Sequence, residues 1–79
     1  METRYTQEQL NQIREQALIY QCACPAQVSR LLSEMLDLHR YQAECLNWTD
    51  VDVAVHRAIA KATEEIYPRM EQCLTEVLT

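Results

Sequence analysis

The sequence predicts an all-α fold, a small antiparallel up-down-up bundle of three helices. The 79 residues include no glycine, so tight hairpin turns that need positive φ are disfavoured. Leu, Ala, Glu and Gln are frequent, and all four favour helix. Three segments also open with helix-start signals. A chain of this length forms one domain, residues 1–79, whose core is marginal without good packing, a metal, a disulfide or oligomerisation.

The charge distribution excludes several kinds of partner. The formal net charge is −5, and the seven basic residues form no cluster, so we expect neither nucleic acid nor an anionic membrane as partner. No apolar stretch is long enough to span a membrane. The N-terminus lacks the basic and apolar regions of a secretory signal. These features predict a cytoplasmic protein, in which cysteines are thiols or metal ligands rather than disulfides.

The first predicted helix covers residues 7–21. Thr6 is a good N-cap, and Gln9 stands where a capping box requires Glu or Gln. Tyr5 and Leu10 occupy the two positions of a hydrophobic staple. Apolar residues then recur at helical spacing, at Leu10, Ile13, Ala17 and Tyr20.

The second predicted helix covers residues 25–46. Pro25 suits the first helical position and disfavours helical geometry at Cys24, which we therefore predict as the N-cap. Asn47 tolerates the left-handed conformation of a C-terminal cap. One broad face of this helix is formed by Val28, Leu31, Leu32, Met35, Leu36, His39, Gln42, Cys45 and Leu46.

The third helix is predicted to start at residue 50. Thr49 is its N-cap, Asp50 and Asp52 carry negative charge in the first turn, and Trp48 with Val53 forms a second staple. A stripe of apolar residues follows, namely Val55, Ile59, Ala62, Ile66, Met70, Cys73 and Val77. A three-helix bundle is the simplest fold that buries this stripe together with those of the other two helices.

Pro68 leaves two interpretations of the third helix. The apolar stripe keeps its phase through Pro68, which favours one long helix kinked near Glu64. The alternative is a break that gives two helices, residues 50–66 and 68–78, and four helices in all.

The segment Cys22-Ala23-Cys24-Pro25 is the most distinctive chemical feature. In an antiparallel bundle Cys22, Cys24 and Cys73 lie near one end, and as three thiolates they would suit zinc, an iron–sulfur cluster or copper(I). At a helix start Cys24 would instead be a reactive redox thiol with Cys22 as its resolving partner, or a haem ligand. The alternative is that these cysteines are small apolar residues, as we expect for Cys45 and Cys73.

Two histidines form a second candidate group. Counted from the second turn, His39 and His56 fall at the same level of adjacent helices, with Asp52 one turn before His56. The spacing lacks the Glu-x-x-His pairs of metal sites in helical bundles, so we interpret both as residues at the edge of the core. The sequence contains no recognisable catalytic constellation, and we expect no enzyme activity.

Two functional hypotheses follow. The first is a non-enzymatic interaction or adaptor protein that self-associates or docks a partner helix, since the core is marginal and exposed apolar residues are expected at Leu18, Leu38 and Val53. The second is a thiol-based accessory protein that binds metal or senses redox state through Cys22 and Cys24, with Cys73 as a third ligand.

Overall fold

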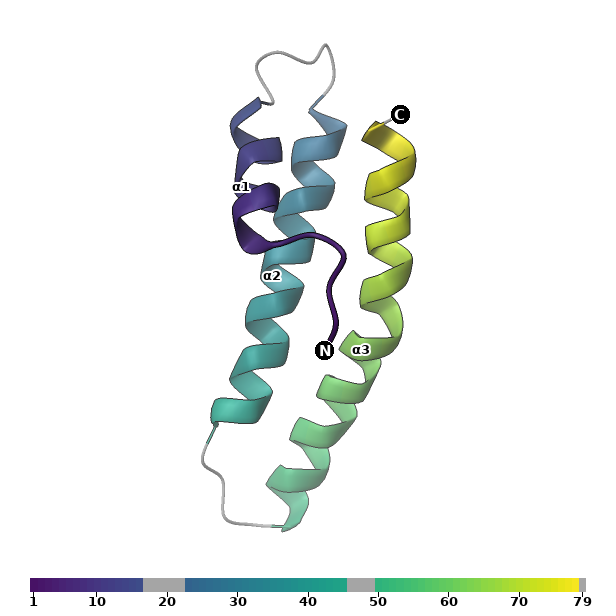
Figure 1. The fold of residues 1–79 in the computed structure, drawn as a ribbon. Coiled ribbons are helices and arrows are strands. Elements are labelled where there is room, and N and C mark those ends of the chain that lie inside the picture. Colours follow the sequence, from purple (N-terminus) through teal and green to yellow (C-terminus); the bar gives the residue numbers. More distant parts are fainter. Residues whose placement is uncertain (17–22, 46–49, 79) are drawn as a thin grey trace.

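The computed structural model describes residues 1–16, 23–45 and 50–78, and over these residues it is all-α. The helices are α1 (Gln7–Glu15), α2 (Cys24–Glu44) and α3 (Asp50–Leu78). Figure 1 shows them running alternately up and down, and α2 contacts both α1 and α3. The molecule is a rod of 48 × 19 × 18 Å. None of the described helices is both long and apolar enough for a transmembrane segment.

The start of α1 confirms the predicted capping box. The hydroxyl of Thr6 accepts a hydrogen bond from the backbone N–H of Gln9 at 3.1 Å, and the Gln9 side chain accepts one from the Thr6 N–H at 2.8 Å. The helix ends at Glu15 with Gln16 as its C-cap, and the rest of the predicted helix, residues 17–21, lies outside the described residues. The Gln7 side chain donates to the Ser33 hydroxyl at 2.9 Å and so joins α1 to α2.

The start of α2 lies one residue before the predicted position. Ala23 is the N-cap, with φ −82° and ψ 8° and no side-chain capping bond, so Cys24 already belongs to the first turn. Pro25 fits this turn because the first N–H groups of a helix have no intrahelical acceptor. The helix ends at Glu44, and Cys45 is its C-cap.

The helix α3 is continuous through Pro68 over 29 residues. The alternative of two helices separated before Pro68 is therefore wrong, whereas the kink near Glu64 stays a prediction. The predicted cap Thr49 and the staple residue Trp48 lie outside the described residues.

The core is small and is built where the three helices meet. Its fully buried apolar side chains are Leu10, Leu32, Tyr67 and Leu74, one each from α1 and α2 and two from α3. Half-buried apolar residues surround them: Tyr5, Ile13, Val28, Met35, Leu36, Met70 and Leu78. The predicted stripes include Leu10 and Leu32, but neither Tyr67 nor Leu74.

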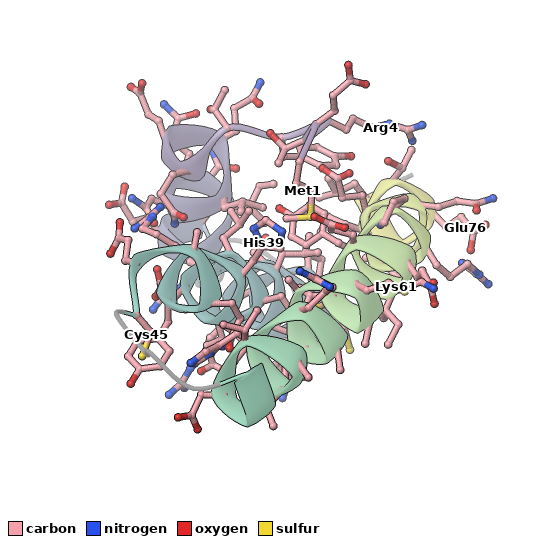
Figure 2. All side chains as sticks on the ribbon, turned by 90° about the horizontal axis from the view of Figure 1, so that it is seen from below. Met1, Arg4, His39, Cys45, Lys61 and Glu76 are labelled. Atoms are coloured by element: carbon pink, nitrogen blue, oxygen red, sulfur yellow. The ribbon has the colours of Figure 1, made fainter. Side chains whose placement is uncertain are left out.

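The N-terminal segment, residues 1–6, fastens the start of the chain to α3. Glu71 is only 5% exposed, and its Oε2 accepts hydrogen bonds from the backbone N–H groups of Arg4 at 2.5 Å and Tyr5 at 3.1 Å. The hydroxyls of Tyr5 and Thr75 lie 2.6 Å apart. Figure 2 shows this segment, with Met1 and Arg4, on the same side of the α2–α3 pair as α1.

Candidate functional site

Only part of the apolar stripe of α3 contacts the core, which corrects the prediction from the sequence: Met70 packs against the core, whereas three other members of the stripe are exposed. Val55, Ile66 and Val77 are 51%, 53% and 41% exposed. The α3 residues that are buried instead are Thr63, Tyr67, Glu71 and Leu74. At 100° per residue these two sets lie about a quarter of a turn apart on the helix. The helix is thus rotated relative to the predicted orientation.

The contacts of the inner face explain this rotation. Tyr67 and Leu74 are fully buried against Leu10 and Leu32, and Glu71 must point inward to receive the N-terminal segment. Tyr67 and Leu74 are both large side chains, and their burial removes much apolar area from water. The inner face therefore combines the largest α3 residue with a carboxylate whose hydrogen bonds compensate for its burial.

Helix α2 adds two exposed leucines on the same side as the α3 stripe. Leu31 and Leu38 are 41% and 45% exposed. Ser33 faces α1 and Gln42 faces α3, and helical spacing puts both leucines next to the α3 contact but away from α1. Leu38 was expected to be exposed, and this is confirmed; Leu18 lies outside the described residues.

We call this surface the open face. Figure 2 shows α1 and the N-terminal segment together on one side of the α2–α3 pair, and no other segment of the described chain on the opposite side. The open face consists of Leu31 and Leu38 of α2 and of Val55, Ile59, Ala62, Ile66, Met70, Cys73 and Val77 of α3.

In the sequence, the α3 part of the open face is marked by apolar residues that repeat at a fixed spacing. Val55, Ile66 and Val77 are separated by 11 residues, as are Ile59 and Met70. An 11-residue repeat, 3.67 residues per turn, stays on one side of a nearly straight helix. The same pattern fits a buried stripe, so the period alone did not distinguish an inner from an outer face.

The histidines line a groove between α2 and α3, in the half of the pair that lies past the start of α1 (Figure 1). Figure 2 shows His39 on the same side of this pair as the N-terminal segment. The groove has a volume of about 380 Å³. His39 does not contact His56 as its level suggested: its Nε2 lies 2.9 Å from Glu64 Oε1, whereas Nδ1 of His56 lies 2.6 Å from Gln42 Oε1. The residues lining the groove are His39, Gln42, Ala43, Cys45, Val53, His56, Arg57, Ala60 and Glu64.

Each imidazole is thus held by a different acceptor. The Glu64 carboxylate fixes the ring of His39, and the rings of His56 and Tyr41 pack in a T-shaped arrangement with their centroids 6.4 Å apart. The Cys45 thiol donates to the Tyr41 hydroxyl at 3.8 Å, and this hydrogen bond raises the pKa of Tyr41. The contacts of His39 and His56 thus join the C-terminal half of α2 to the N-terminal half of α3 through polar side chains.

Three of the four cysteines lie among the described residues. Cys24 is disulfide-bonded, whereas the sequence predicted thiols or metal ligands. Cys73 is a free thiol, half-buried on the open face, and Cys45 is likewise outside any disulfide. Cys22 lies outside the described residues.

Among the described residues no group of three His, Cys, Asp or Glu side chains is arranged to hold a metal ion. A site of Cys22, Cys24 and Cys73 for zinc, an iron–sulfur cluster or copper(I) would require Cys24 as a thiolate. That site, like a haem ligand at Cys24, therefore stays a prediction for the reduced protein.

The comparisons with known proteins add no assignment to this geometry: no protein-family model matches the chain, and no curated protein and no solved structure matches it significantly.

Proposed function

We propose that the protein is a non-enzymatic helical interaction module that binds an amphipathic α-helix on the open face. The observation that carries this proposal is the exposure of Val55, Ile66 and Val77, three apolar residues in one row along α3. A row of this kind matches the way in which helix-binding proteins present apolar positions at helical spacing.

The small core supports the same proposal. Four apolar side chains are fully buried, whereas the open face exposes apolar residues from both long helices. Water contact with such a surface is unfavourable in proportion to its area, and covering it with a helix removes that cost. Contiguous exposed apolar surface on a small protein is typical of an interaction site.

Binding of an apolar fluorescent dye, together with sedimentation, tests this proposal. We expect the wild type either to bind the dye or to be assembled with its open face covered, and Ile66→Glu to abolish whichever is observed. Val53→Glu is the matched control, because Val53 is a 42% exposed valine of α3 that lines the groove rather than the open face. A wild type that neither binds dye at Ile66 nor assembles would contradict the proposal.

A second candidate function is favoured by the state of Cys24. A disulfide-bonded cysteine in the first turn of α2 supports a redox role over a metal site, because N–H groups at a helix start stabilise the thiolate that forms on reduction. We propose Cys22 as the resolving thiol. Cys24→Ser should then remove the reversible change in free thiol count, and Cys45→Ser should not; equal effects would contradict a redox role.

A further inference from the structure

We propose that a second copy of this chain occupies the open face, so that the α2–α3 pairs of two copies form a four-helix core with both α1 helices outside. This inference rests on the proposed function and names the partner. Its geometry is a two-fold axis that passes between the two α3 helices at the level of Ile66, with the two helices antiparallel.

The exposed area of the chain matches the requirement of such a dimer. The molecule exposes 5869 Å², whereas a compact monomer of 9.3 kDa is expected to expose roughly 5,000 Å². The excess of about 900 Å² belongs to the whole rod rather than to the open face alone, and it is of the same order as the ~800 Å² that each partner contributes to a stable interface of standard size.

The residue spacing of α3 is self-complementary about Ile66. Val55 and Val77 lie at equal distances on either side of Ile66, so an antiparallel second copy places Val55 against Val77 and the two Ile66 side chains against each other. The same symmetry sets Ile59 against Cys73 and Ala62 against Met70. Each of these last two contacts pairs a large side chain with a small one, as a well-packed interface requires.

The exposed leucines of α2 can pair about the same two-fold axis. The contacts from His39 to Glu64 and from Gln42 to His56 define how α2 lies along α3. Extended along both helices, these two contacts put residues between about 32 and 37 level with Ile66, and the midpoint between Leu31 and Leu38 falls within this range. One two-fold axis therefore sets Leu31 of one copy against Leu38 of the other, as an isologous interface demands.

The charges at the rim of the α3 row agree with this pairing. Glu65 and Arg69 lie one turn apart beside Ile66 and are both exposed. Antiparallel pairing about Ile66 brings Arg69 of one copy next to Glu65 of the other, twice per dimer. Such rim charges contribute little affinity but select partner and orientation.

Sedimentation velocity and native mass spectrometry of the full chain test the dimer. We expect a dimer for the wild type and for Val53→Glu. For Ile66→Glu we expect a rise of roughly 100-fold or more in the dimer dissociation constant, because the substitution enters the interface twice at its centre. Circular dichroism shows whether each variant keeps its helices.

Two further sets of variants test the antiparallel geometry. Arg69→Glu should weaken the dimer because it sets two acidic residues against each other, and adding Glu65→Arg should restore it. Ile66→Cys in a background with Cys45→Ser and Cys73→Ser should give a covalent dimer on oxidation, since residues on the axis approach closely enough for a disulfide.

The outcomes separate the dimer from the proposed function. A dimer that Ile66→Glu leaves intact, or that the charge exchange fails to restore, overturns this geometry. A monomeric wild type at all concentrations also overturns the inference; if that monomer binds the apolar dye in an Ile66-dependent way, the helix-binding function survives with another partner. A monomer that binds no dye contradicts both.

Discussion

Replacing Tyr67 by phenylalanine should stabilise the protein, although Tyr67 is the largest side chain in the core. Its ring is fully buried, and its hydroxyl has no hydrogen-bond partner among the described residues. A buried polar group without a partner costs about 1–3 kcal/mol of stability. Phenylalanine keeps the ring and its packing and removes that cost.

The expected gain in the free energy of unfolding is therefore about 1–3 kcal/mol. For a domain of this size each kcal/mol raises the melting temperature by roughly 4–8 °C. Urea and thermal denaturation followed by circular dichroism measure both quantities. All variants must be compared at one protein concentration, because association changes the apparent stability.

Tyr5→Phe provides a matched control, since it removes the same atom from a hydroxyl that has a partner. The Tyr5 hydroxyl lies 2.6 Å from the Thr75 hydroxyl, and losing this hydrogen bond should cost about 0.5–1.5 kcal/mol. The two substitutions should thus change stability in opposite directions. A loss of stability in Tyr67→Phe would refute the reasoning, because it would mean that the Tyr67 hydroxyl forms a hydrogen bond in solution.

Three further predictions concern buried polar groups, two of them at other residues. Ser29→Ala should raise the unfolding free energy by about 1 kcal/mol, because the Ser29 hydroxyl is buried without a partner in the described part of the chain and alanine favours helix. A lower unfolding free energy of the variant, measured by urea denaturation, would contradict this. Glu71→Gln should cost about 1.5–3 kcal/mol, since it removes a charged acceptor of two backbone N–H groups. The control Glu44→Gln, on an exposed residue outside the open face, should stay within about 0.5 kcal/mol. Burial and the charge of Glu71 raise the pKa of Tyr67 to about 12, whereas an unfolded tyrosine ionises at pH ~10. The free energy of unfolding should therefore be constant below pH ~10 and fall by up to roughly 2–3 kcal/mol as the pH rises to about 12. Urea denaturation across this range should show a smaller fall in Tyr67→Phe.

Local signals predicted the helix starts well, because all their atoms lie within a few residues. The capping box of Thr6 and Gln9 forms as the sequence indicates, and Pro25 lies in the first turn of α2. The helical phase of α3 across Pro68 likewise predicted a continuous helix. In each case the interaction depends on the order of neighbouring residues alone.

The orientation of α3 was not predictable in this way, because it depends on residues far apart in the sequence. From its sequence neighbours alone Glu71 would be assigned to the surface, because the N–H groups that bind it belong to Arg4 and Tyr5, 67 and 66 residues earlier. Tyr67 and Leu74 lie beside the apolar stripe in sequence, and only tertiary packing decides that they, rather than Ile66, point inward. The open face was therefore identified from the structure, although its residues were already known as a stripe.

The bond between the first and last parts of the chain also has a consequence for synthesis on the ribosome. The acceptor of the Arg4 and Tyr5 N–H groups is Glu71 of α3, so the N-terminal segment has no docking site until α3 has been translated. The nine residues of α1 are too few for a stable helix without tertiary contacts. The hydrogen bonds that hold the N-terminal segment, and the complete core around Leu10 of α1, therefore form only after α3 has been synthesised.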